Sequence, residues 1–187
     1  LHGMIGVLAA LHHRERTGEG QHVEVSLLAS ALSGLVNHTG AFTAAGVVPH
    51  RMGNAHPSVY PYQTMPTGDR DVVIAAANDR QFRALCGVLG VDELADDPRF
   101  RLNADRTDHR DEVHPLLVEQ LRQWSADDLF IALNRAGVPC GPINSIQEGV
   151  ELAGRLGLDP VVTTGDGDRA VGSIRNPITF SGAAASY

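Results

Sequence analysis

An α/β fold is predicted for this chain of 187 residues, with an Ala-rich layered part followed by a smaller α+β part. Three features of the sequence predict it. The first part has the pattern of a helix, a strand and a helix in succession. The second part begins with two alternating segments around a tight turn and continues with amphipathic helices. Residues 46–60 lie between the two parts, have no periodicity and contain two Pro and two Gly, which is typical of a long connection.

The first part begins with a predicted helix over residues 1–15, because apolar side chains recur there at helical spacing. Gly18 follows at a position where glycine commonly ends a helix. Residues 22–26 alternate polar and apolar side chains and are predicted to form a strand. Residues 27–44 are apolar and rich in Ala, Ser and Gly, so we expect a buried, closely packed helix.

The second part is predicted to open with strands at residues 62–65 and 72–76, joined by a turn at residues 68–71. Three amphipathic helices follow, each preceded by a residue type that caps helix N-termini. These helices are residues 80–89 after Asn78 or Asp79, residues 109–121 after Asp108, and residues 126–137 after Ser125.

The rest of the second part is predicted to be less regular. Residues 138–142 have two Pro around Gly141 and are expected to be irregular. Ser145 and Glu148 have the spacing of a capping box, which predicts one more short helix. From Val161 onward we expect short strands joined by turns that contain Gly and Asp.

The composition is that of an ordinary globular protein and excludes several classes of partner. Net charge is −7, all 15 basic residues are Arg, and they form no basic stripe, so nucleic acid is not expected as a partner. Apolar runs are too short to cross a bilayer, so no membrane partner is expected. Cys86 and Cys140 lie far apart and give no disulfide framework, which favours a cytoplasmic protein.

The beginning of the chain predicts that it belongs to a longer protein. Residues 1–11 are apolar but lack the basic segment and the cleavage site of a signal peptide. The chain starts with Leu1 at a point that is already helical, so we expect further residues before it. An exposed apolar face with Met4, Leu8 and Leu11 predicts self-association to a dimer or a larger species.

No metal site is expected among the nine His residues. His12 and His13 are adjacent and point to different sides of a helix, while His109 and His114 are five residues apart and miss the chelating spacing of a helix. Cys140 lies in a segment rich in Pro and Gly, and no base is placed near it by the sequence. We interpret it as a small residue in a tight turn, not as a nucleophile.

The segment with the richest chemistry is the loop formed by Gly53, Asn54, Ala55, His56 and Pro57, which follows Arg51. It brings an amide, an imidazole and a guanidinium into seven residues. Such a set is suited to binding an acyl group or a carboxylate. A surface loop without a role remains the alternative.

Several stretches taken in order resemble one family, the class III CoA-transferases, which includes formyl-CoA transferase, carnitine CoA-transferase and α-methylacyl-CoA racemase. Each stretch is weak alone, but their order and spacing together are specific and cover nearly the whole chain. They are residues 6–11, Arg14, residues 17–26, Arg51, residues 53–57, Pro61-Tyr62, residues 76–82, residues 97–100 and residues 136–142.

The resemblance implies a large Rossmann-like α/β domain with a smaller domain inserted in it. Residues 1–50 would then be the end of the large domain, residues 51–160 a small α+β domain, and residues 161–187 a return segment toward the large domain. Family members form homodimers whose two chains thread through each other like linked rings. A homodimer is therefore implied here.

The resemblance also implies a mechanism. Transferases of this family form a mixed anhydride between an Asp and the acyl group and then pass CoA to a new carboxylic acid. The partners would be an acyl-CoA, which is a substrate and not a tightly bound cofactor, and a carboxylic acid. The family Asp lies shortly before Leu1, so no residue of this chain inherits the catalytic role, and the chain by itself is expected to be inactive.

Residues 53–57 occupy the place where formyl-CoA transferase has a mobile run of glycines, so they are the implied substrate-binding residues. Here His56 and Pro57 replace glycine, and proline stiffens the chain.

Two alternatives to a transferase stay open. The racemase branch uses a downstream acidic residue, and Asp79 lies at that position, although Asp79 also suits a helix N-cap. The segment around Asn78 and Asp79, together with residues 53–57, resembles the transferase branch more closely. The second alternative is a module that only binds or dimerises.

Overall fold

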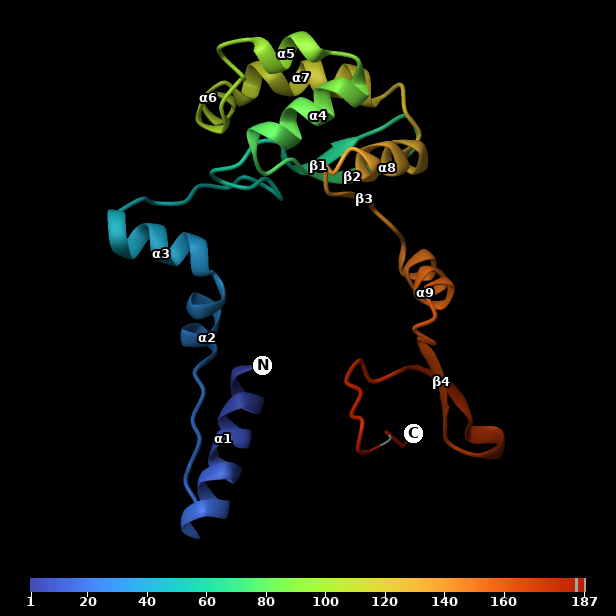
Figure 1. Ribbon diagram of the computed structural model, residues 1–187. Coiled ribbons are helices and arrows are strands. Elements are labelled where there is room, and N and C mark those ends of the chain that lie inside the picture. Colours follow the sequence, from blue (N-terminus) through green and yellow to red (C-terminus); the bar gives the residue numbers. More distant parts are fainter. Residues whose placement is uncertain (184, 187) are drawn as a thin grey trace. The chain divides into compact units, whose positions relative to one another are not determined.

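The computed structural model describes residues 1–183 and 185–186, and it contains helices together with two small antiparallel sheets (Figure 1). Its contacts divide the chain into two compact units, Leu1–Gly53 and Asn54–Tyr187. The mixture of helix and sheet agrees with the predicted α/β class. The assignment of the three segments 1–50, 51–160 and 161–187 to domains of a larger fold stays a prediction.

The first unit contains three helices, α1 (His2–Thr17), α2 (Leu27–Gly34) and α3 (Val36–Ala45). Gly18 ends α1 with φ of 80°, which confirms the predicted C-terminus, because glycine adopts this left-handed backbone without steric cost. The single helix predicted over residues 27–44 is divided at Leu35 into α2 and α3.

Two expectations for this unit are wrong. Residues 22–26 are irregular and not a strand, because no strand of the described residues lies beside them to accept their backbone hydrogen bonds. Residues 27–44 were expected to be buried, but α2 and α3 contain no buried residue, because no other element covers their apolar side chains.

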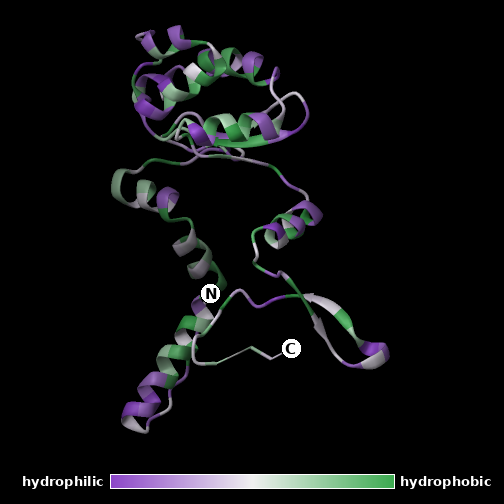
Figure 2. Cartoon of the chain, turned by 45° about the vertical axis from the view of Figure 1, so that its right-hand side comes forward, coloured by the Kyte–Doolittle hydropathy of each residue, from purple (hydrophilic) through white to green (hydrophobic). Residues whose placement is uncertain are grey.

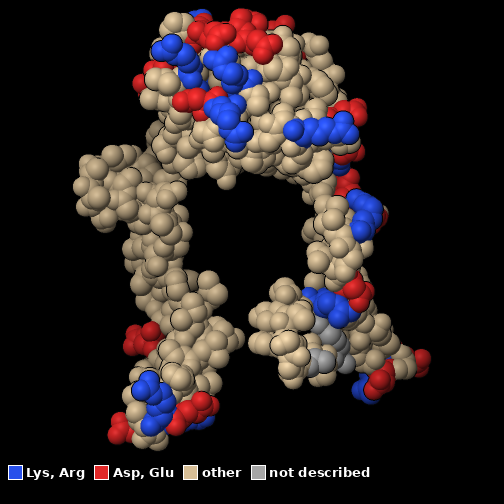
Figure 3. Space-filling model, viewed as in Figure 1, with Lys and Arg blue, Asp and Glu red and all other residues tan. Residues whose placement is uncertain are grey.

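The surface of α2, α3 and the first half of α1 is therefore largely apolar, whereas the second half of α1 is hydrophilic (Figure 2). Residues 27–45 contain no Lys, Arg, Asp or Glu, and the corresponding surface carries no charge (Figure 3). Large exposed apolar surfaces of this kind mark contact with other protein surface. The exposed large side chains on α1, α2 and α3 are Met4, Ile5, Val7, Leu8, Leu11, Leu27, Leu28, Leu32, Val36 and Phe42.

The second unit is built on a three-stranded sheet of β1 (Tyr62–Pro66), β2 (Asp71–Ala75) and β3 (Cys140–Pro142), in the order β1-β2-β3. All neighbours are antiparallel. The first two strands confirm the sequence prediction. The third corrects it, since residues 140–142 pair with β2 although they were expected to be irregular; Pro142 is tolerated because β3 is an edge strand.

Five helices complete the core of this unit: α4 (Asp79–Leu89), α5 (Asp92–Asp96), α6 (Asn103–Asp108), α7 (Arg110–Leu121) and α8 (Ala126–Arg135). Figure 1 shows them gathered beside the three-stranded sheet. Their apolar faces and the sheet enclose one hydrophobic core. Its fully buried large side chains include Tyr60, Met65, Ile74, Phe82, Leu85, Phe100, Leu117, Leu121, Leu129 and Leu133.

The helix caps mostly follow the prediction. The side chain of Ser125 accepts a hydrogen bond from the Asp128 N–H at the start of α8. For α4 the cap is Asn78, whose side chain accepts from the Gln81 N–H. The expected Asp108 cap of α7 is wrong, because Asp108 is the last residue of a separate helix, α6.

The remaining elements are α9 (Ile146–Arg155), β4 (Val161–Thr164), a short 3-10 helix η1 (Gly167–Arg169) and β5 (Val171–Ile174). The capping box predicted from Ser145 and Glu148 is formed at the start of α9. Strands β4 and β5 pair antiparallel, as expected for short strands joined by a turn with Gly and Asp.

Arg106 is the largest fully buried side chain of the second unit, with an exposed fraction of 0%. Its guanidinium donates to the carbonyls of Tyr60, Phe100 and Arg101 at 2.8–3.0 Å, and to Asp79 Oδ1 at 2.8 Å. It also lies 4.3 Å from the centre of the Phe82 ring. A buried cation is stable only with such partners, so this residue joins the segment before β1 to α4 and α6.

Replacing Arg106 with Met should lower the free energy of unfolding by about 3–5 kcal/mol, because three carbonyls and a carboxylate lose their donor. Urea unfolding followed by the fluorescence of Trp124, the single Trp, which packs against the core, measures the change. Arg101→Met is the matched control on an exposed side chain. Equal stability of the two variants would contradict the prediction.

Candidate functional site

The segment that follows Gly53 lies along the free edge of β1. Strand β1 pairs with β2 through one edge only. At the other edge the Tyr62 carbonyl accepts a hydrogen bond of 2.9 Å from the His56 N–H. Asn54, two residues before His56, contacts Thr64, which lies two residues after Tyr62. The two contacts therefore have the register of an antiparallel strand pair.

The side chain of Asn54 takes the place of a strand backbone in this contact. Its Oδ1 accepts from the Thr64 N–H at 3.0 Å, and its Nδ2 donates to Thr64 Oγ1 at 2.8 Å. An amide side chain offers the same donor and acceptor as a peptide group. The edge of β1 is thereby covered, which removes a site where other strands would pair.

The ring of His56 is held in one orientation. It stacks on the Tyr62 ring with 5.2 Å between ring centres and 11° between ring planes. Its Nδ1 accepts a hydrogen bond of 3.1 Å from the Ser58 N–H. Because a nitrogen that accepts cannot also carry a proton, the neutral imidazole has its N–H at Nε2.

The first residues of helices α6 and α7, Asn103 and Arg110, also hold the segment that follows Gly53. Arg110 Nη2 donates to the His56 carbonyl at 2.9 Å, and its guanidinium lies 5.2 Å from the centre of the Tyr60 ring. Asn103 Nδ2 donates to the Ser58 carbonyl at 2.8 Å, and Asn103 Oδ1 accepts from the Tyr60 N–H at 3.1 Å. The loop is therefore anchored to the strand and to two helices.

A buried phenol lies beneath the loop. The hydroxyl of Tyr60 is 3.0 Å from His114 Nδ1, and Gln63 Nε2 is 3.3 Å from the same nitrogen. Burial raises the pKa of the Tyr60 phenol well above its usual range, so the phenol stays neutral and serves as structural support.

The structure brings only part of the predicted site together. Asn54 and His56 lie against β1, Ala55 is half-buried between them, and Pro57 is exposed. Gly53 ends the first unit with φ of 64°, a backbone conformation that favours glycine. The substrate-binding role of these five residues stays a prediction.

Sequence reasoning missed the residues that hold the loop, which are Tyr62, Thr64, Asn103 and Arg110. No local pattern marks Asn103 or Arg110, since each lies more than 40 residues from its partner along the chain. The only signal is indirect: a long irregular segment must find partners for its backbone groups elsewhere in the fold.

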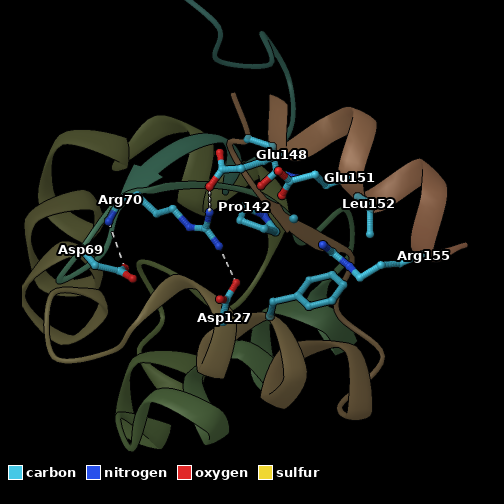
Figure 4. A pocket seen from close by; sticks show the side chains of 11 residues that line it. Asp69, Arg70, Asp127, Pro142, Glu148, Glu151, Leu152 and Arg155 are labelled. Atoms are coloured by element: carbon cyan, nitrogen blue, oxygen red, sulfur yellow. Dashed lines mark hydrogen bonds and ion pairs between the residues drawn. The ribbon is translucent and has the colours of Figure 1, made fainter. Parts of the chain in front are cut away.

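A separate pocket of about 580 Å³ lies beside the turn between β1 and β2 (Figure 4). Arg70 crosses it and pairs with Asp127 of α8 and with Glu148 of α9. Four carboxylates and two guanidiniums line this pocket, so it disfavours an anionic ligand such as a carboxylate or a CoA phosphate. The charged residues are Asp69, Arg70, Asp127, Glu148, Glu151 and Arg155.

Hydrogen bonds keep two of these carboxylates ionised. The Ala126 N–H and the Thr67 hydroxyl lower the pKa of Asp69 below its usual range. The backbone and the hydroxyl of Ser145 lower the pKa of Glu148, and the charge of Arg70 adds to the effect.

Other kinds of site find little support in the described part of the chain. No three His, Cys, Asp or Glu residues there gather in the way that a metal ion needs. Burial raises the pKa of the Cys86 thiol to about 12 and raises that of Cys140 as well, which disfavours either thiolate as a nucleophile. None of the helices described is both long and apolar enough to cross a bilayer.

Comparison with known proteins adds the family context. A family model described as CoA-transferase family III matches residues 1–187. Succinate–glutarate CoA-transferase of Agrobacterium fabrum is 40% identical over 148 residues, which are 79% of this chain and 37% of that protein. Acetyl-CoA:oxalate CoA-transferase of Acetobacter aceti is 35% identical over 177 residues, which are 95% of this chain and 44% of that protein. The chain thus spans less than half the length of these relatives.

Solved structures agree with the fold. A CAIB/BAIF family protein from Brucella suis matches with a TM-score of 0.77 and 38% identity, over 96% of this chain and 46% of that one. Rv3272 from Mycobacterium tuberculosis matches with a TM-score of 0.82 over 97% of this chain and 48% of that one. Its identity is 23%, so this second match supports the fold alone.

The lowered pKa of Glu148 predicts how the attachment of α9 responds to pH. A depressed folded-state pKa contributes stability above the usual value of 4.5, and this contribution is lost as the pH falls through the folded-state value. Wild type should therefore melt above Glu148→Gln at neutral pH, and the difference should shrink as the pH falls below 4.5 and through the folded-state pKa.

Thermal unfolding followed by far-UV circular dichroism measures this difference. Glu151→Gln is the matched control, because Glu151 lies one turn further along α9 and receives its bond from Gln147 of the same helix. A Glu148→Gln difference that stays constant down to the lowest pH would contradict the prediction.

Proposed function

Because the chain belongs to CoA-transferase family III, we propose that it is part of an enzyme that moves CoA between carboxylic acids. The match of the family model to residues 1–187 is the observation that carries this proposal. Relatives named for succinate, glutarate and oxalate point to short dicarboxylic acids as the substrates. An acyl-CoA thioester would be a substrate here, with no cofactor bound tightly.

We propose that the nucleophile is an Asp supplied by a part of the protein outside these 187 residues. Its carboxylate would attack the thioester carbonyl, the C–S bond would break, and CoA thiolate would leave as the aspartyl-acyl anhydride forms. The CoA thiolate would then attack the aspartyl carbonyl of the anhydride, which releases the first acid and leaves an aspartyl-CoA thioester. The carboxylate of the second acid would displace CoA thiolate from this thioester to form a second anhydride. Attack of the thiolate on the new acyl carbonyl would give the new acyl-CoA and free the Asp. The 187 residues alone would be inactive, and the intact protein would act as a cytoplasmic homodimer.

The loop Gly53, Asn54, Ala55, His56 and Pro57 is proposed to cover the acyl site. Support comes from its attachment to β1, which keeps the half-buried His56 in one orientation. The hydrogen bonds of Asn54 and Ser58 leave little freedom for the loop to swing. The loop would therefore form one wall of the site, and this wall would keep its position when substrates bind.

A racemase that removes an α-proton is the second candidate, with Asp79 as the base. The geometry of Asp79 disfavours it: its Oδ1 accepts a bond of 2.8 Å from the buried guanidinium of Arg106. Accepting a proton on this oxygen would break the ion pair and leave a buried guanidinium without its carboxylate. A module that only binds or dimerises is the third candidate, and its support is the apolar surface of the first unit.

One assay separates the three candidates. A protein that carries these residues together with the preceding segment is incubated in D2O with acyl-CoA thioesters and free dicarboxylic acids, and the products are read by mass spectrometry. A new acyl-CoA made from a supplied acid supports the transferase. Deuterium at the α-carbon without acyl exchange identifies a racemase, and neither product indicates a binding module.

The role of the loop has its own test. His56→Ala should lower kcat/KM of the same protein by roughly tenfold or more, because one hydrogen bond to the acyl group or acid is lost. His50→Ala, at an exposed position before the loop, serves as the control. Unchanged kinetics in His56→Ala would remove the loop from the site.

A further inference from the structure

Arg110 forms no ion pair with a carboxylate in the part of the chain that the structure describes. Five other arginines, Arg70, Arg83, Arg99, Arg106 and Arg175, each form at least one. Its partners are the His56 carbonyl and the face of the Tyr60 ring. Neither partner cancels a full positive charge, so the charge persists beside the loop.

His56 complements this charge with a directed donor. Its Nδ1 is occupied by the Ser58 N–H, which places the ring proton on Nε2. Among the described residues Nε2 has no partner, and the Tyr62 ring holds the imidazole plane. A nitrogen donor with a set direction, on a residue whose backbone a cation holds in place, is suited to binding a carboxylate.

We propose that Arg110 is a positioning residue for His56, and that the Nε2–H of His56 donates to the carboxylate of the acid substrate. Arg110 acts by donating to the His56 carbonyl at 2.9 Å, which fixes the backbone from which the imidazole projects. This inference rests on the proposed function, since it names the part of the acid that the loop would contact.

Two other arginines of the second unit, Arg70 and Arg106, are poorer places for the carboxylate. The pocket crossed by Arg70 is lined by twice as many carboxylates as guanidiniums, and Arg70 is already paired with Asp127 and Glu148. Arg106 is fully buried and uses its donors on three carbonyls and Asp79. Arg110 is only half-buried and its charge is available.

The first test reads the geometry without any activity. In Arg110→Met the backbone amides of His56 and Ser58 should exchange with deuterium roughly tenfold to a hundredfold faster, because the loop loses a charged hydrogen bond. The Met side chain keeps the apolar contact with the Tyr60 ring. Arg122→Met, at the other end of α7, is the matched control and should leave these amides unchanged. Equal exchange in both variants overturns the role of Arg110.

Tyr62 offers a second variant should Arg110→Met fold poorly. Tyr62→Phe keeps the ring that stacks on His56, whereas Tyr62→Leu removes it. Nitrogen NMR of labelled His should show the proton of His56 on Nε2 in wild type and in Tyr62→Phe, and a mixture of both tautomers in Tyr62→Leu. A proton on Nδ1 in wild type overturns the inference.

The kinetic test separates this inference from the proposed function. Arg110→Met in the longer protein should raise KM for the acid by roughly tenfold and change kcat little, because a ground-state contact is lost. In a protein that already carries His56→Ala, the further change Arg110→Met should raise KM for the acid little more, since Arg110 acts through His56. Additive effects overturn the positioning role. Wild-type kinetics in His56→Ala would instead refute the proposed loop function, whatever the exchange data show.

Discussion

The buried guanidinium of Arg106 is the interaction on which the second unit depends. It binds the Tyr60 carbonyl, the Phe100 carbonyl and the Asp79 carboxylate at once, while its plane lies over the Phe82 ring. These groups belong to segments that are far apart in the sequence. Burying a cation is costly, so the position is stable only when all of its partners are in place. The residue therefore requires one particular arrangement of the loop before β1, of α4 and of α6.

That arrangement explains why the loop around His56 has one conformation. Because Arg106 holds Tyr60, the chain enters β1 at a set position, and the residues before it can meet the free edge of the strand. Asn54 then completes the edge with its side-chain amide, and Asn103 holds Ser58 from α6. A segment rich in Pro and Gly thus becomes ordered through contacts with its surroundings and not through secondary structure of its own.

The sequence predicted those features whose cause lies within a few residues. The caps at Ser125 and Ser145 are examples, since each hydroxyl accepts a hydrogen bond from the N–H three residues later and so favours the start of a helix. Residues 22–26 show the limit of such patterns. Their polar and apolar side chains alternate as in a strand, but a strand forms only where a partner strand pairs with it. The bond from Arg110 to the His56 carbonyl joins residues 54 apart, and no local pattern contains it. The loop was therefore identified from the sequence, but the residues that hold it were not.

An ordered loop has a physical advantage at a binding site. A run of glycines must lose its conformational freedom each time it closes on a ligand, at roughly 1–2 kcal/mol for each residue that becomes ordered. Asn54, His56 and Ser58 have already lost that freedom through their bonds to Thr64, Tyr62 and Asn103. Binding energy from a carboxylate at His56 would then appear as affinity and not be consumed in ordering the chain. At the proposed site the same order would limit the size of the acid that fits, because a wall that cannot move excludes substrates that a mobile loop would accommodate.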